Sequence, residues 1–273
     1  MNIEDLDLTY SAEEIREFIQ EAVARKGTQR QPRFYAVTGS HIYGFDSPDS
    51  DIDVRGLHVA PAEEYASLRT PTGEVTVNMD GTTEGFEQYG EIDLRSYELR
   101  KFGSLLEKAN YNVVELVFEA PMVMNGIPLE MDALEDLIRE YLPMNVPHAY
   151  LGMAKSNYYK HLDPEKTEGY DPRPKKFFYV YRGLLGAQYV LNHEDIEADI
   201  RRLAADVDGG DPDLVEDLIV HKREADEPTV PDVLEERARD AITEQFNALD
   251  ALPDPDKSDY REALDDWMHK VRT

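Results

Sequence analysis

The chain of 273 residues carries 57 acidic against 29 basic side chains, for a net charge of −28, and it contains no cysteine. The absence of thiols excludes disulfides, thiolate catalysis and cysteine-ligated zinc. Neither an apolar run long enough for a membrane span nor a signal-peptide pattern occurs, so we expect a cytoplasmic protein with no membrane partner. An apolar content of 41% is enough for a buried core, and the length favours two domains.

The acidic charge is spread along the chain and is not gathered in one tail. Two interpretations stand. We favour adaptation to a high-salt cytoplasm, where screening makes self-repulsion cheap, over an ordinary acidic surface. Nucleic-acid binders usually carry a basic face, so a nucleic-acid partner would need a local basic cleft here.

The first predicted element is an amphipathic helix. Ser11 and Glu14 have the spacing of a capping box, apolar residues recur at helical intervals through Val23, and Gly27 is typical of a helix stop. Strands and short helices are then expected to alternate. The predicted strands cover 34–37, 51–59 and 91–97. Between the first two we predict the start of a helix over 41–45 and a turn over 47–50, and between the last two a short helix and hairpin within 61–83, with turns at 71–73 and 80–81. A helix over 98–109 follows, and then a small helix that leads into an edge strand over 110–118.

Beyond about residue 128 only helices are predicted, over 129–141, 147–162, 176–192, 194–207, 212–223, 231–249 and 260–271. The expected fold class is therefore α+β. We expect a first domain with a short sheet over residues 1–128, and a helical domain over 129–273 that closes a cleft against it.

The candidate chemistry lies between residues 37 and 56. A Gly39-Ser40 turn follows the first strand, and such a turn presents backbone N–H groups and a hydroxyl that suit phosphate oxygens. Asp51 and Asp53 point to the same face of the next strand, where two carboxylates repel unless a cation lies between them. A metal next to phosphate indicates phosphoryl or nucleotidyl transfer, and nucleotidyl transfer uses two divalent ions, Mg²⁺ or Mn²⁺.

A metal site of this kind needs a further carboxylate from a neighbouring strand. Asp93 is the preferred candidate for catalysis and metal binding, and Glu91, on the same face of the same strand, is the alternative. Ser50 is a candidate substrate contact or only a turn former. Arg55 could contact phosphate or form a surface ion pair.

The segments 39–44 and 48–56, with 97–102 and 110–116, resemble the DNA polymerase beta superfamily of nucleotidyltransferases. The closer similarity is to a predicted nucleotidyltransferase branch that includes an RNA-repair-associated member. The resemblance implies a minimal palm in which Gly39 and Ser40 hold the triphosphate. It also implies that Asp51, Asp53 and a third acid bind Mg²⁺, with Asp51 bridging two ions and Asp53 or Asp93 helping to deprotonate the acceptor.

Basic residues are densest between 173 and 182, where Lys175, Lys176 and Arg182 could clamp a triphosphate or an acceptor. The alternative is pairing with nearby acids such as Asp171. In the same branch a histidine is expected where this chain has Tyr179. A second, smaller basic patch is His221-Lys222-Arg223.

Three functions compete at this point. The favoured one is an enzyme that moves a nucleoside monophosphate from a nucleoside triphosphate, such as ATP, to a hydroxyl on an RNA or tRNA end, a small molecule or a protein. The others are a non-catalytic nucleotide-binding or antitoxin-like module on the same fold, and a purely structural acidic protein. The base, the acceptor and the oligomeric state stay open.

Overall fold

The structure is a computed structural model that describes residues 2–25, 29–47, 50–68, 71, 73–78, 85–167, 169–224, 229–252, 254 and 260–272. The chain divides into two compact units. The first unit comprises 1–42, 48–138 and 258–273, and the second comprises 43–47 and 139–257. A single border between 128 and 129 was expected, and the observed division differs from it because the chain crosses between the units repeatedly.

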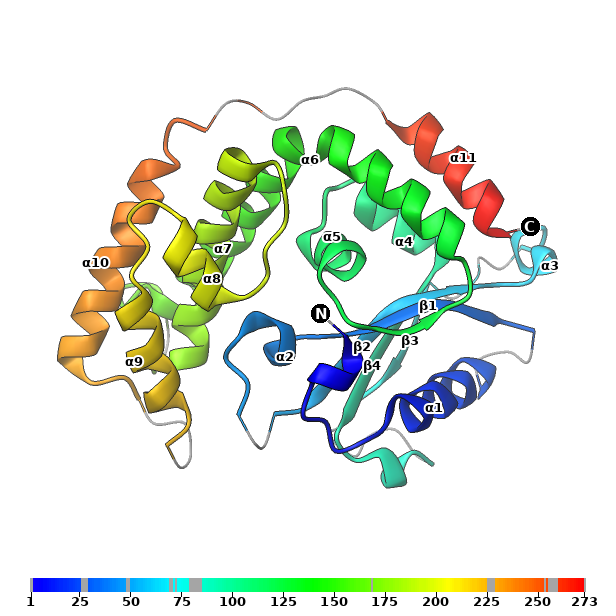
Figure 1. Ribbon diagram of the computed structural model, residues 1–273, viewed down its shortest axis with the longest axis horizontal. Coiled ribbons are helices and arrows are strands. Elements are labelled where there is room, and N and C mark those ends of the chain that lie inside the picture. Colours follow the sequence, from blue (N-terminus) through cyan, green and yellow to red (C-terminus); the bar gives the residue numbers. More distant parts are fainter. Residues whose placement is uncertain are drawn as a thin grey trace. The chain divides into compact units, whose positions relative to one another are not determined.

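The first unit is built on a five-stranded mixed sheet with strand order β3-β4-β2-β1-β5 (Figure 1). The strands are β1 (Gln31–Thr38), β2 (Ile52–Val59), β3 (Glu74–Val77), β4 (Ile92–Glu98) and β5 (Met122–Asn125). β1 pairs antiparallel with β2 and β5, whereas β2 and β4 run parallel. The sheet, with the helical region beyond it, confirms the α+β class.

Helix α1 (Ala12–Arg25) covers one face of the sheet (Figure 1). The capping box is present, because the Ser11 amide donates to the Glu14 carboxylate at 2.8 Å and the Glu14 amide donates to Ser11 Oγ at 3.3 Å. The apolar stripe from Ile15 to Val23 is buried against the sheet as predicted. Gly27, the expected helix stop, lies outside the described residues, as do residues 80–81 of the expected hairpin turn.

Helices α4 (Leu99–Leu106) and α5 (Tyr111–Phe118) lie over the other face (Figure 1). The small helix and edge strand expected near residues 110–118 are α5 and β5, although β5 begins only at Met122. Shorter elements of this unit are η1 (Ile3–Asp5), α2 (Ser40–Tyr43), α3 (Ala62–Tyr65) and η2 (Glu87–Tyr89).

The helix α11 (Arg261–Arg272) also belongs to the first unit, although it was expected in the helical domain. Its Trp267 packs on Phe102 of α4 with ring centroids 6.0 Å apart, and the indole N–H donates to the Glu130 carbonyl at 2.7 Å. The Tyr260 hydroxyl donates to the Leu106 carbonyl. An apolar ring with a satisfied polar atom therefore fixes α11 on α4.

The second unit is helical. It contains the later part of α6 (Pro128–Asn157), the π-helix η3 (Tyr158–Leu162), α7 (Pro174–His193), α8 (Ile200–Asp206), α9 (Pro212–Lys222) and α10 (Asp232–Ala248) (Figure 1). Two helices expected at 129–141 and 147–162 are instead one continuous helix. Proline was taken as a boundary, but the helix continues through Pro147, where one backbone hydrogen bond is lost. Helix α8 begins six residues later than predicted, because Glu194 is left-handed and Asp199 caps the helix.

A buried polar cluster lies at the end of β2 away from Asp53. His58 is fully buried, with Nε2 at 3.0 Å from Arg30 Nη1 and Nδ1 at 2.8 Å from Ser96 Oγ. Because a guanidinium can only donate, Nε2 must accept and Nδ1 must carry the proton. Burial lowers the pKa of His58 to about 4, and the Arg30 charge acts in the same direction.

We expect the protein to lose stability as the pH falls from about 6.5 to 4. His58 is neutral in the fold but takes up a proton near its ordinary pKa of 6.5 when unfolded, so acid favours the unfolded state. The loss should reach the order of 3 kcal/mol at pH 4. Urea unfolding of the wild type and of His58→Gln between pH 8 and 4.5 measures it. A wild-type profile as flat as that of the variant would contradict the assignment.

Candidate functional site

The turn after β1 is shaped around one carboxylate. Gly39 has φ +73°, a left-handed conformation that favours glycine. A Cβ at Gly39 would lie only 2.0 Å from Asp53 Oδ2. The Asp53 carboxylate therefore occupies the space that a side chain at residue 39 would need. The backbone agrees, since Thr38 and Asp53 are register partners in the β1–β2 pair. The Gly39-Ser40 turn and Asp53 therefore form one local structure.

A second carboxylate lies beside Asp53. In the parallel pair β2–β4, Asp53 is the register partner of Asp93, and both side chains are half-buried. Register partners on neighbouring strands, about 4.8 Å apart, point to the same face. Glu91, the alternative third acid, is exposed and precedes β4, where its backbone carbonyl accepts from the Ile52 amide at 2.7 Å.

The two strands carry closely similar tetrapeptides in the same register. Ile-Asp-Val-Arg over 52–55 lies against Ile-Asp-Leu-Arg over 92–95, residue for residue. The alternation of a strand places the aliphatic residues in the core below α1, and the acids and arginines on the opposite face. A pair of carboxylates is thus followed, two residues along, by a pair of guanidinium groups. Arg95 was missed in the sequence, where the repeated tetrapeptide was the available signal.

Neighbouring elements hold the two arginines. Arg55 Nη1 donates to Asn112 Oδ1 of α5 at 2.5 Å, and Arg95 Nε lies 3.1 Å from Glu74 Oε1 of β3. Burial raises the pKa of the Tyr97 phenol, and the charges of Arg55 and Arg95 act in the opposite direction. The guanidinium pair therefore lies close to Tyr97 on the face that carries the acids.

The other predicted site residues of this region lie before Asp53 in the sequence. Asp51 is exposed and directly precedes β2, while Ser40 and Ser50 are half-buried. Within the described residues, no three carboxylate or imidazole groups are placed so that they could hold a metal ion. The strand register thus brings Asp53 and Asp93 side by side, and Asp51 is an exposed side chain directly before β2.

The predicted basic clamp lies in the second unit. Lys175 is exposed, whereas Lys176 Nζ donates to the Asp171 carbonyl at 2.6 Å and Arg173 forms a 2.6 Å ion pair with the Asp171 carboxylate. Arg182 is fully buried, with its guanidinium carbon 3.7 Å from the centre of the Tyr43 ring. Helix packing therefore buries Arg182 while Lys175 is exposed, and the carboxylate partner that the alternative expected at Asp171 is found for Arg173.

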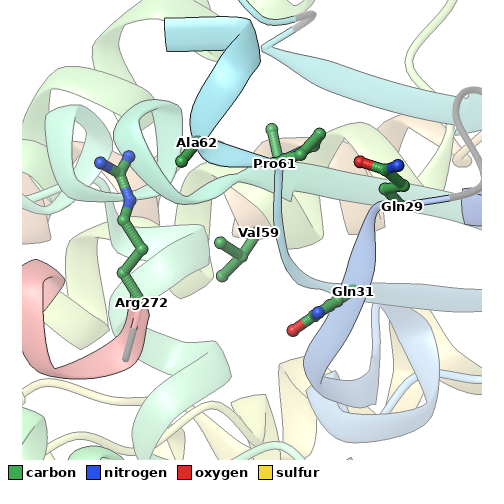
Figure 2. Close-up of a pocket in the computed structure, with 7 residues that line it drawn as sticks. Gln29, Gln31, Val59, Pro61, Ala62 and Arg272 are labelled. Carbon is green, nitrogen blue, oxygen red and sulfur yellow. The ribbon is translucent and has the colours of Figure 1, made fainter.

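A pocket of about 360 Å³ in the first unit is separate from the acids (Figure 2). The guanidinium of Arg272 lies on one side and the amides of Gln29 and Gln31 on the other, with Val59 between them. Val59 ends β2 whereas Asp53 lies near its start, so about 20 Å of strand separates them. This pocket does not belong to the carboxylate site.

The comparison that decides the family covers almost the whole chain: residues 15–270 match the RNA repair pathway DNA polymerase beta family. The chain belongs to this family. The resemblance expected from residues 39–56 is thereby confirmed, and the protein is a member of the nucleotidyltransferase superfamily.

The chain is also similar to two other proteins. The chain is 29% identical over 164 residues to the uncharacterized protein YcgL of Bacillus subtilis, covering 59% of this chain and 57% of that protein. It is 25% identical over 201 residues to the uncharacterized protein MJ0002 of Methanocaldococcus jannaschii, covering 72% and 76%. The match thus spans little more than half of the bacterial relative. None of the described helices is long and apolar enough to cross a bilayer.

Proposed function

We propose that this protein transfers a nucleoside monophosphate from a nucleoside triphosphate to an acceptor hydroxyl, with Mg²⁺ or Mn²⁺ as cofactor. The observation that carries the proposal is the paired Asp-x-Arg sequence of β2 and β4. Two carboxylates abreast suit a divalent cation, and two guanidinium groups next to them suit the phosphates that such a cation accompanies.

The chemistry of the donors fits Mg²⁺. Asp53 and Asp93 supply carboxylate oxygens from fixed strands, and the exposed Asp51 would add a third. Bound divalent ions would polarise the phosphate and lower the pKa of the attacking hydroxyl. Without a cation between them, two carboxylates on the same face of the sheet repel each other.

The residues of the chain have distinct roles in the proposed step. The acceptor oxygen attacks the α-phosphorus, the bond from that phosphorus to the bridging oxygen breaks, and pyrophosphate leaves. Asp53 or Asp93 receives the hydroxyl proton. The Gly39-Ser40 turn, Arg55 and Arg95 hold the phosphate oxygens through backbone N–H groups and guanidinium donors.

We favour an RNA end as the acceptor, because the family to which the chain belongs is assigned to an RNA repair pathway. The net charge of −28 opposes binding of long nucleic acid by general electrostatics. A short or structured RNA end, such as a tRNA 3′ end, therefore suits the chain better than a long strand. Small-molecule and protein hydroxyls are the competing acceptors.

The test is an assay of pyrophosphate release. The protein is incubated with Mg²⁺ or Mn²⁺ and each labelled triphosphate, at low and high salt, with short RNA, protein or small-molecule acceptors in separate arms. Transfer of label to one acceptor would support the proposal. Nucleotide binding without transfer in every arm would instead favour the non-catalytic nucleotide-binding module.

Asp93→Asn should lower turnover at least about tenfold, whereas Glu91→Gln should stay within about twofold of the wild type. The reason is that Asp93 lies beside Asp53 in the sheet, while Glu91 is exposed before the strand. Mn²⁺ binding followed by electron paramagnetic resonance gives a second readout. A larger loss in Glu91→Gln than in Asp93→Asn would reverse the assignment.

A further inference from the structure

The pocket at the end of β2 combines an apolar lining with a few polar side chains (Figure 2). The apolar part is the segment 59–62, whose first two residues are buried. The polar part is Gln29, Gln31 and Arg272, and all of these residues belong to the first unit. Small-molecule sites are built in this way, and the volume of about 360 Å³ lies within their usual range.

The guanidinium of Arg272 is held in place by stacking. Its carbon lies 3.8 Å from the centre of the Tyr65 ring, and α11, which carries it, is anchored on α4 through Trp267. Stacking covers one face of the guanidinium and leaves the N–H donors in its plane for a ligand. Within the part of the chain that the structure describes, no carboxylate forms an ion pair with Arg272.

The charge of Arg272 acts on one buried acid, Glu98. Burial raises the pKa of the Glu98 carboxyl, and the Arg272 charge acts in the opposite direction. Both carboxylate oxygens have other donors, because the Tyr65 hydroxyl donates to Oε1 and the Arg100 amide donates to Oε2 at 2.9 Å. Glu98 therefore fixes the ring on which Arg272 stacks and leaves the guanidinium donors to the pocket.

The opposite wall of the pocket is fixed by Arg30, which is buried between the two glutamines in the sequence. Arg30 Nη1 lies 3.0 Å from His58 Nε2, and Nη2 forms a 2.7 Å ion pair with Glu64 of α3. Among the described residues, the side-chain amides of Gln29 and Gln31 have no hydrogen-bond partner. Each amide therefore offers N–H donors and a carbonyl acceptor to the pocket.

We propose that this pocket binds a small organic anion. Its terminal phosphate or carboxylate accepts the in-plane donors of Arg272 in a charge-assisted contact. Its body lies on the apolar segment 59–62, and a group that both donates and accepts hydrogen bonds, such as an amide or the edge of a nucleobase, meets Gln29 and Gln31. The site is separate from the carboxylates of the first unit, since Val59 and Asp53 lie toward opposite ends of β2.

The test is a titration of the full chain at low salt without divalent ions. AMP is the phosphate probe and N-acetylglutamate is the carboxylate probe, so their relative affinity identifies the anion that the pocket prefers. We expect the bound probe to shift the backbone amide signals of residues 29–31 and 59–62 in NMR spectra, with those of 39–40 and 93–95 unchanged. Inorganic phosphate has no body to cover the apolar segment and should bind at least about tenfold more weakly than AMP.

Two variants test the walls of the pocket. Arg272→Ala should weaken binding of the preferred probe at least about tenfold, because the charge-assisted contact is lost. Gln31→Glu should weaken it as well, because a carboxylate then faces the anion. Arg261→Ala is the matched control, since it removes the same charge from the other end of α11, where Arg261 pairs with Glu107. Its affinity should stay within about twofold of the wild type, and melting temperatures show that each variant is folded.

Three results would overturn the inference. One is that neither AMP nor N-acetylglutamate binds the wild type at about 10 mM. Another is an equal loss of affinity in Arg272→Ala and Arg261→Ala, since that pattern reports only the net charge of the protein. The third is a set of shifted amides confined to 39–40 and 93–95, which would place the probe at the carboxylate site. Because the titration needs neither Mg²⁺ nor nucleotidyl transfer, its result is independent of the proposed function.

Discussion

Asp53→Asn should slow pyrophosphate release about a thousandfold and leave the protein folded. Asp53 is in contact with both other parts of the site. It is the register partner of Asp93 in the sheet, and its carboxylate fills the space at Gly39. Loss of its charge removes a main ligand of the proposed cation, and such stabilisation is worth several kcal/mol, or about three powers of ten in rate. The assay is steady-state pyrophosphate release at saturating Mg²⁺.

Stability provides the control for this variant. The amide is nearly isosteric with the carboxylate, and it relieves a like-charge contact with Asp93, so without divalent ions Asp53→Asn should unfold at the same or a higher temperature than the wild type. Added Mg²⁺ should raise the melting temperature of the wild type more than that of the variant. Full activity of the Asp53→Asn variant would contradict the metal-assisted mechanism.

Gly39→Ala should lower turnover about a hundredfold. The new methyl group would lie 2.0 Å from Asp53 Oδ2, so the carboxylate must rotate away from the turn. A displacement of about 1 Å at a reacting group costs about two powers of ten in rate. The left-handed backbone adds a stability cost of about 1 kcal/mol. Kinetics and urea unfolding of the same preparation measure the two effects.

Gly169→Ala is a matched control for this substitution. Gly169 has φ +64°, close to that of Gly39, but a Cβ there would meet no atom within 4 Å. Both variants should therefore show the stability cost of the left-handed backbone, while only Gly39→Ala also displaces Asp53 and loses turnover. Equal turnover in the two variants would show that the contact between Gly39 and Asp53 does not matter for the reaction.

Local signals in the sequence predicted the elements of the first unit well. The Ser11 capping box and the stripe from Ile15 to Val23 define α1, because both depend on neighbours within one or two turns. The Asp-x-Asp spacing identified the strand that carries Asp53. The pairing of Asp53 with Asp93 was only an expectation, since register between distant strands is set by the whole sheet.

Tertiary contacts explain what the sequence did not reveal. Arg182 was a candidate for the basic clamp because helical spacing defines a face but not which face is buried. Arg95 was overlooked because a tetrapeptide repeated forty residues apart gains meaning only when the two strands are parallel neighbours. Similarly, Lys222 and Arg223 find their partners about 175 residues earlier in the chain.

The membership of α11 in the first unit has a consequence for synthesis on the ribosome. Phe102 and Leu106 of α4 contact Trp267 and Tyr260, which are translated only after all of α7–α10. The palm therefore cannot complete its packing as the N-terminal half emerges, and the helical unit has the opportunity to fold first. Shortened chains that end before residue 260 would leave an apolar face of α4 uncovered and should aggregate.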